Sequence, residues 1–153
     1  MEGGGRCRRL EQIEIGGYNA FTQGCWLWPV DTPHDGTRIR IGNGNYFNRN
    51  VMIDACGCVE IGDDNMFGPD IYITDSNHMP VAGKSPKELP MHVGRVRIGN
   101  QCWIGAKAII LKDVELGDGC VVGAGAVVTK SFPAGSVIVG VPGCALSRSS
   151  SAE

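Results

Sequence analysis

The sequence has no long hydrophobic run and almost no excess charge. No segment approaches the ~20 apolar residues that a membrane-spanning helix needs, and the opening MEGGGRCRRL is not followed by the apolar stretch of a signal peptide. The formal net charge is only −2, so the composition does not indicate nucleic acid or an anionic membrane as a partner. We therefore expect a cytoplasmic protein, and the length of 153 residues predicts one domain over residues 1–153.

Paired cysteines are also missing. The seven cysteines are an odd number, and no C-x-x-C motif occurs among them. This pattern argues against both a disulfide framework and a zinc ribbon.

Glycine, in contrast, is abundant, with 23 of 153 residues, about twice its usual share. It accompanies a repeat in which an aliphatic residue or phenylalanine recurs at every sixth position. The repeat occupies fifteen positions: Ile15, Phe21, Leu27, Ile41, Phe47, Ile53, Ile61, Phe67, Ile73, Ile98, Ile104, Ile110, Leu116, Val122 and Val128. Glycine directly follows eight of these residues.

A period of six does not match the 3.6-residue period of an α-helix. It suits a short strand followed by a tight turn, because glycine supplies turn geometry that other residues resist. Hexapeptide periodicity is typical of parallel β-helices. Three hexads then make one triangular coil of 18 residues, and coils stack at about 4.8 Å. Cys102 and Cys120, which are 18 residues apart, are predicted to be small inward-facing residues on adjacent coils.

The coils are interrupted by insertions of different lengths. Successive coil starts at Ile15, Ile41, Ile61, Ile98 and Leu116 leave insertions of 8, 2, 19 and 0 residues beyond the 18-residue period. We expect an all-β protein of about five coils, roughly 24 Å tall at the usual strand spacing, with one long loop over residues 75–97. The slender core favours packing against other copies. Periodicity does not give the handedness, and the general rule favours right-handed crossovers.

The long loop begins at the stretch TDSNHMP and contains Pro80, Pro86 and Pro90. Proline prevents helices and central strands, and loops of this length in compact domains are usually functional or disordered. His78 lies where the loop leaves the coil. A histidine, with an unperturbed pKa of about 6.5, suits a general base at neutral pH. The residues alone leave an ordinary surface histidine equally open.

Residues 45–143 resemble the hexapeptide-repeat acyltransferases, in particular the maltose- and galactoside-type sugar O-acetyltransferases. The stretches that carry the resemblance are NYFNRNVMID, VEIGDDNMFGPDIYITDSNHMPV, RIGNQCWIGAKAIILKDVELGDGCVVGAGAVVTK and FPAGSVIVGVP. The resemblance implies a left-handed β-helix, against the general rule. It also implies a homotrimer with active sites between neighbouring subunits, acetyl-CoA as donor and no metal.

The resemblance also implies roles for individual residues. His78 matches the catalytic histidine, and the backbone N–H of Ala106 matches the donor that stabilises the tetrahedral oxyanion. Asn48, Tyr46 and Met91 match residues near the acceptor, although Asn48 is also a natural turn residue. Either Asp75 or a backbone carbonyl could orient His78. The implied acetyl-CoA contacts are Trp103, Gly105, Ala106, Ala124, Thr129 and Lys130, with the lysine near the phosphates.

Two positions depart from the family pattern. Cys56 stands where relatives carry an acceptor-site aspartate, and Cys144 follows the GVP motif where a basic residue is usual. We therefore expect an acceptor other than maltose or a simple galactoside, and one phosphate contact to be lost or moved.

The preferred hypothesis is an acetyl-CoA-dependent O-acetyltransferase acting on a sugar hydroxyl of a surface polysaccharide or a nucleotide sugar. An amino-sugar N-acetyltransferase is the nearest alternative, because the same base would serve an amine. A non-catalytic β-helix scaffold is a second alternative. A zinc enzyme of the carbonic-anhydrase type would need three imidazoles, but His34 and His92 lie in predicted loops and the H-x4-H spacing is missing. We expect the tail 147–153 to be disordered.

Overall fold

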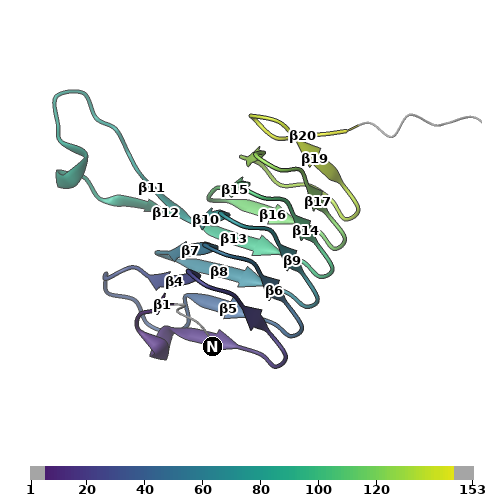
Figure 1. The fold of residues 1–153 in the computed structure, drawn as a ribbon. Helices are drawn as coiled ribbons and strands as arrows, with labels where there is room; N and C mark the ends of the chain where they lie inside the picture. Colours follow the sequence, from purple (N-terminus) through teal and green to yellow (C-terminus); the bar gives the residue numbers. More distant parts are fainter. Residues whose placement is uncertain (1–5, 147–153) are drawn as a thin grey trace, which may run out of the picture.

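A computed structural model, which describes residues 6–146, forms three parallel sheets that are the sides of a triangular prism (Figure 1). Sheet A contains β1 (Arg6–Cys7), β4 (Trp26–Pro29), β7 (Met52–Ala55), β10 (Tyr72–Thr74), β15 (Ile109–Ile110) and β18 (Val127–Val128). Sheet B contains β2 (Ile13–Ile15), β5 (Ile39–Ile41), β8 (Cys58–Ile61), β13 (Arg95–Ile98) and β16 (Val114–Leu116). Sheet C contains β3 (Ala20–Phe21), β6 (Tyr46–Phe47), β9 (Met66–Phe67), β14 (Trp103–Ile104), β17 (Val121–Val122) and β19 (Val137–Val139), with β20 (Cys144–Ala145) antiparallel at its end.

Each turn of the chain passes from sheet B to sheet C and then to sheet A. Five complete coils result, from β2–β3–β4 to β16–β17–β18, which confirms the predicted number. Successive strands of one sheet pair in parallel with residues of the same repeat position opposite each other, such as Phe47 with Phe67. The hexad period therefore sets the register.

The repeat residues form the core. Thirteen of the fifteen are buried, and the exceptions are Ile15 and Phe21. Both belong to the first coil, which has no complete coil on its other side. Phe21, Phe47 and Phe67 stack with ring centroids 4.5 and 4.6 Å apart and nearly parallel planes. Cys102 and Cys120 are 2% and 0% exposed, so the predicted inward position of both is confirmed.

A ladder of asparagines runs along the corner between sheets B and C. Asn19 Oδ1 accepts from the Asn45 backbone N–H at 2.8 Å, and Asn45 Oδ1 accepts from the Asn65 N–H at 2.9 Å. Asn65 Oδ1 in turn accepts from the Cys102 N–H at 2.7 Å. The two upper asparagines are almost fully buried, and their side chains satisfy backbone groups of the corner that would otherwise lack partners.

The long insertion forms an arm that projects from the corner between sheets A and B (Figure 1). It contains an antiparallel ribbon of β11 (Ser76–His78) and β12 (Met91–Val93), with the short 3-10 helix η2 (Pro86–Glu88) between the two strands. The prolines lie outside both ribbon strands. The insertion also ends at Gly94 and not at residue 97, because β13 begins three residues before its inward residue Ile98.

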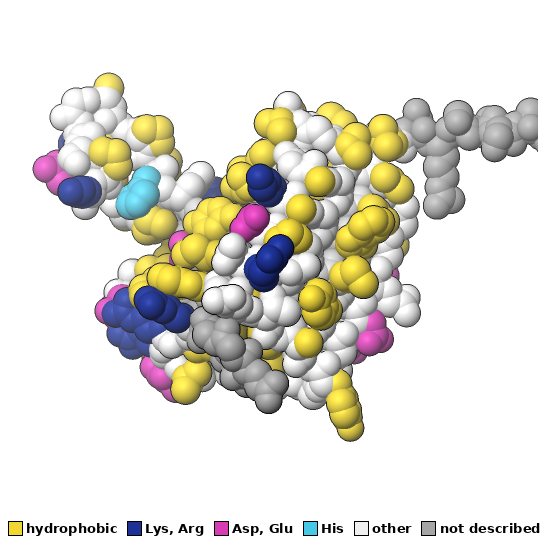
Figure 2. Space-filling model, viewed as in Figure 1, with side chains coloured by type: hydrophobic (Ala, Val, Ile, Leu, Met, Phe, Trp, Pro, Cys, Tyr) yellow, Lys and Arg dark blue, Asp and Glu magenta, His cyan; other side chains and the backbone are white. Residues whose placement is uncertain are grey.

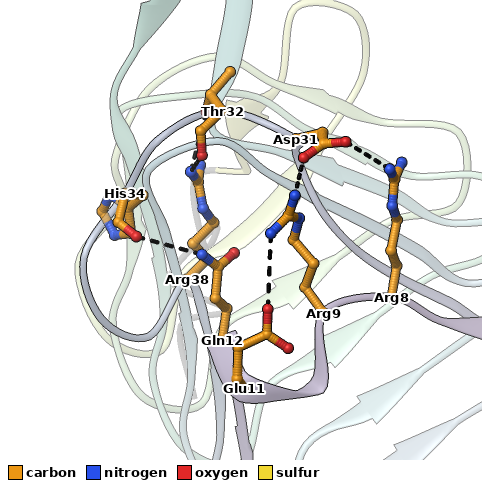
Figure 3. A network of polar contacts seen from close by, with 8 residues as sticks. All are labelled: Arg8, Arg9, Glu11, Gln12, Asp31, Thr32, His34 and Arg38. Carbon is orange, nitrogen blue, oxygen red and sulfur yellow. Dashed lines mark hydrogen bonds and ion pairs between the residues drawn. The ribbon is translucent and has the colours of Figure 1, made fainter.

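The N-terminal end of the prism is closed by a polar network around the 3-10 helix η1 (Leu10–Gln12) (Figure 3). Asp31 accepts from the guanidinium groups of Arg8 and Arg9, and Gln12 Nε2 donates to the His34 carbonyl at 3.4 Å. Arg38 is fully buried and donates to the Thr32 carbonyl at 2.6 Å. These contacts tie the N-terminal segment to the loop that follows β4.

The tail 147–153, for which we predict disorder, lies outside the described residues. Within residues 6–146, no helix has the length and apolar character needed to cross a bilayer.

Candidate active site

The corner between sheets C and A is built from one turn repeated on every coil. On the fourth coil, the Ala108 N–H donates to the Gly105 carbonyl at 3.3 Å, and Lys107 has a φ of +60°. A positive φ at the third residue of such a turn is the signature of type II geometry. Asn50, Asp70 and Gly125 have the same positive φ on the second, third and fifth coils.

The second position of this turn leaves its N–H free to meet a ligand. Ala106 and Ala124 occupy this position, and within residues 6–146 neither N–H donates to an acceptor. The preceding residue is glycine in both cases, so no side chain competes for the N–H. On the third coil the same position is Pro69, which has no N–H, and proline is favoured there.

Glycine below each free N–H also keeps the space in front of it open. A Cβ at Gly68 would lie 2.8 Å from the Ala106 nitrogen, and a Cβ at Gly105 would lie 2.6 Å from the Ala124 nitrogen. Any larger residue would block the approach to these donors.

These turns line a groove of about 460 Å³. Its walls are Gly68, Pro69, Trp103, Gly105, Ala106, Val121, Val122, Gly123 and Ala124. Four of the six predicted acetyl-CoA contacts therefore lie in one groove. Gly68 and Pro69 were not predicted as groove residues. Their position in the repeat, which is that of Gly105 and Ala106 one coil above, could have indicated them.

The groove opens onto an apolar column on the outer face of sheet C (Figure 2). Tyr46, Met66 and Trp103 follow one another in register on β6, β9 and β14. Tyr46 is 39% and Trp103 57% exposed, and a contiguous exposed column of large apolar side chains is typical of an interaction or ligand-binding surface.

The structure is compatible with both roles that the sequence leaves open for Asn48, a turn residue and an acceptor contact. Its Oδ1 accepts from the Arg49 N–H at 2.8 Å, which is the role of a turn residue. Its Nδ2 has no partner among the described residues, so this amide remains available as a donor on the outside of the corner.

His78 and Met91 lie opposite each other on the arm. Ribbon pairing joins His78 to Met91 and Asn77 to His92, so the two pairs occupy opposite faces of the ribbon. His78 is exposed, and within the described residues its imidazole has no hydrogen-bond partner. The structure thus brings together two of the predicted site residues, His78 and Met91.

The root of the arm borders a second cavity of about 370 Å³, lined by Ser76, Asn77, Leu111, Lys112, Asp113 and Thr129. The Lys112 ammonium donates to Asp113 and, with a smaller contribution from His92, lowers the pKa of that carboxyl group. Thr129 directly follows β18 of sheet A and so lies at the corner between sheets A and B. The neighbouring Lys130 has its Nζ 5.6 Å from the centroid of the Phe132 ring.

Asp75 fastens the root of the arm. Its two carboxylate oxygens accept from the Cys56 and Gly57 backbone N–H groups, each at 2.8 Å, and its own carbonyl accepts from the Gly94 N–H at 2.7 Å. Burial raises the pKa of the Asp75 carboxyl group, and the two N–H donors oppose that rise. Both oxygens are engaged with backbone, and within the described residues no hydrogen bond joins Asp75 to His78. Asp75 and a backbone carbonyl both stay predictions for the group that orients His78.

The histidine and the free N–H groups lie at different corners of the same prism. The arm leaves from the corner between sheets A and B, whereas Ala106 and Ala124 lie at the corner between sheets C and A. The two cavities share no lining residue. One chain alone therefore does not place His78 beside the Ala106 N–H.

A metal centre has no support in the described part of the chain. Between residues 6 and 146, no three histidine, cysteine, aspartate or glutamate side chains are grouped so that they could hold an ion.

Part of the hexad repeat matches a described repeat family. Residues 95–130 match the family model described as bacterial transferase hexapeptide (six repeats). The chain thus carries the hexapeptide repeat and resembles the hexapeptide-repeat acetyltransferases, and the left-handed parallel β-helix implied by the resemblance is confirmed.

Two curated relatives show the same similarity. Nodulation protein L of Rhizobium leguminosarum bv. viciae is 44% identical over 82 residues, which are 52% of this chain and 41% of that protein. Galactoside O-acetyltransferase of Escherichia coli (strain K12) is 35% identical over 88 residues, which are 58% of this chain and 43% of that protein. The chain therefore spans less than half the length of these relatives.

Solved structures agree on the fold. A galactoside acetyltransferase in complex with coenzyme A superposes with a TM-score of 0.71 at 32% identity, covering 88% of this chain and 64% of that one. An N-acyltransferase from Bacillus cereus, in complex with dTDP and coenzyme A, gives a TM-score of 0.79 at 20% identity, covering 94% of this chain and 76% of that one.

Proposed function

We propose that the chain is an acetyl-CoA-dependent acetyltransferase that acetylates a sugar hydroxyl at a site shared by two subunits of a homotrimer. The observation that carries the proposal is the pair of free N–H groups at Ala106 and Ala124, which face space kept open by glycine. An extended amide chain such as pantetheine pairs with such a ridge of backbone donors. The galactoside acetyltransferase of similar fold was solved with coenzyme A.

In the proposed reaction His78 takes the proton of the acceptor hydroxyl while its oxygen attacks the thioester carbonyl. The resulting tetrahedral oxyanion accepts from the Ala106 N–H. When the carbon–sulfur bond breaks, the imidazolium returns the proton to the CoA thiolate. No acyl-enzyme forms, and His78 ends in the state in which it began.

The separation of the two corners supports a shared site. His78 and Met91 lie on an arm that projects away from the prism (Figure 1), while Ala106 and Trp103 lie on another edge. The arm of one subunit reaching the groove of its neighbour would complete the site, and would also place Thr129 and Lys130 for a role in binding CoA.

The outer faces support an oligomer that covers sheets A and C. Sheet B carries alternating charges outward, and Arg40 pairs with Glu14 at 3.0 Å and with Glu60 at 2.8 Å. The outward column of sheet A is apolar or aromatic above Arg6, with Trp26, Met52, Tyr72, Ile109 and Val127, and the half-buried Asp54 lies beside it. The outward column of sheet C contains Tyr46, Met66, Trp103, Val121 and Val137. Apolar faces gain from burial against another copy, whereas the charged face is suited to water.

The first test measures thiol release from acetyl-CoA by wild type and His78→Ala, with panels of sugars, nucleotide sugars and amino sugars. We expect release that depends on a sugar hydroxyl, and a loss of about 100-fold or more in the variant, as for removal of a general base. His34→Ala, in the loop between β4 and β5, is the matched control and should keep the wild-type rate.

The outcomes separate the alternatives. Release with amino sugars alone would identify an N-acetyltransferase, and equal rates in both proteins would remove His78 as the base. Failure of the wild type to bind CoA would indicate a scaffold.

A further inference from the structure

Arg49 is a charged residue at the corner of the candidate site, and the proposed mechanism leaves its side chain unused. It occupies on the second coil the turn position that Pro69, Ala106 and Ala124 occupy above it. The column is joined by hydrogen bonds from Asp70 N to Arg49 O at 2.8 Å, from Lys107 N to Pro69 O at 2.9 Å and from Gly125 N to Ala106 O at 2.8 Å. At the usual spacing of strands, Arg49 therefore lies about 10 Å below Ala106 on the same edge of the prism.

The Arg49 guanidinium is exposed and has no ion pair or ring contact within the described residues. Most other arginines there are engaged. Arg8, Arg9, Arg40 and Arg97 pair with carboxylates, Arg6 lies over Trp26, and Arg38 binds buried carbonyls. Only Arg95, on sheet B, shares the unpaired state of Arg49 among residues 6–146.

The backbone that presents Arg49 is held in place. The Asn48 side chain accepts from the Arg49 N–H at 2.8 Å, and Asn50 Nδ2 donates to Asp70 Oδ1 at 2.8 Å. The nearest carboxylate along this corner thus has a partner of its own. A fixed turn with an unpaired cation is more suited to a ligand than a flexible loop would be.

The order of the coils gives the direction from which a ligand meets Arg49. In the proposed complex, the donor uses Ala106 and Ala124 and extends over the upper coils. The lower part of the corner, from Gly68 down to Asn48, is then left for the acceptor. A group attached to the acceptor on the side away from the thioester would lie next to Arg49.

We infer that the acceptor carries an anionic group, a phosphate or a carboxylate, and that Arg49 binds it. This inference rests on the proposed function, because it uses the position of the thioester. The planar guanidinium matches both anions with two parallel hydrogen bonds. Arg49 is thus a specificity-determining residue that selects charged sugars over neutral ones.

The test measures binding by calorimetry to the CoA-loaded protein, for wild type, Arg49→Gln, Arg49→Lys and Arg95→Gln. The probes are UDP-glucose and UDP for phosphate, glucuronic acid for carboxylate, and methyl glucoside as the neutral sugar. We expect at least one anionic probe to bind more tightly than methyl glucoside, with a loss of about 10-fold or more in Arg49→Gln, as for a charge-assisted hydrogen bond. Arg49→Lys should restore part of that loss, and Arg95→Gln should behave as wild type.

Comparison of the probes tells which anion is recognised. If Arg49→Gln binds both UDP-glucose and UDP more weakly than wild type does, the recognised anion is a pyrophosphate. If it binds only glucuronic acid more weakly, the recognised anion is a carboxylate. Loss of CoA affinity in Arg49→Gln would assign the residue to the donor and overturn the inference. So would a wild type that binds CoA but prefers methyl glucoside or ignores all anionic probes. A wild type that does not bind CoA would instead reject the proposed function.

Discussion

Pro69 and Ala106 occupy the same turn position on neighbouring coils, and each follows a glycine. The chain itself therefore shows that this turn accepts proline. The difference between the two residues is a single N–H, which at Ala106 has no acceptor within the described chain. A proline at position 106 would therefore remove one backbone donor without altering the fold.

Ala106→Pro should abolish most activity while leaving the protein folded. Losing one oxyanion donor typically lowers kcat by about 100- to 1,000-fold, and the local backbone already suits proline. Steady-state kinetics with the acceptor found in the panel, together with thermal unfolding, would check this. Ala106→Ser keeps the N–H and is the matched control. Unchanged kcat in the proline variant would show that the oxyanion is stabilised elsewhere.

Single strands of two to four residues are too short to be stable alone, so the coils depend on stacking between repeat positions. The phenylalanine stack is the clearest instance, since Phe47 lies between Phe21 and Phe67 with both neighbours about one strand spacing away. Phe47 is fully buried, whereas Phe21 at the open end is only half-buried.

Phe47→Ala should lower the free energy of unfolding by about 3–5 kcal/mol, because it removes a buried ring and leaves a cavity between two others. Phe21→Ala should cost clearly less, since water already reaches that ring. Urea denaturation at fixed protein concentration would measure both. Equal losses would mean that end and interior coils are equally stabilised, contrary to the stacking argument.

The arm is the element whose placement matters most for chemistry. Asp75 binds the Cys56 and Gly57 N–H groups, and a Cβ at Gly57 would lie 2.5 Å from the Gly94 carbonyl oxygen. The root of the arm is therefore packed closely on the coil below. The direction of the ribbon, and with it the position of His78, follows from this close contact.

At the scale of the whole molecule, His78 and Ala106 lie at different corners of one chain, so the proposed active site needs a second copy of the chain. His78→Ala and Ala106→Pro should each be nearly inactive alone, yet regain activity when unfolded together and reassembled. In randomly mixed trimers about a quarter of the shared sites would combine an intact histidine from one subunit with an intact Ala106 from its neighbour. Activity assays of the reassembled mixture, with sedimentation to confirm the trimer, would check this.

The control is the same treatment of each variant alone, which should give only the low residual activity of that variant. A mixture that stays inactive while wild type regains activity would show that the site lies within one subunit. It would also remove the argument for the arm reaching a neighbour.

The core and the number of coils can be predicted from the sequence alone, because the inward residue of each hexad is a local requirement that every coil repeats. Cys102 and Cys120, 18 residues apart, could be placed inside on that ground alone. The groove residues Gly105, Ala106 and Ala124 could also be found, since the resemblance covers those coils. Handedness came from the resemblance and not from the period, which is the same for either hand.

The arrangement of the insertion, in contrast, becomes visible only in the folded chain. Proline content argued against helices and central strands, and the strands that form, β11 and β12, pair only with each other off the prism. The role of Asp75 was likewise hidden, because its partners Cys56 and Gly57 lie one coil away and are backbone groups that carry no residue signature. The separation of His78 from Ala106 depends on which corner each turn occupies, and a linear repeat does not contain that relation until the coils are closed into a prism.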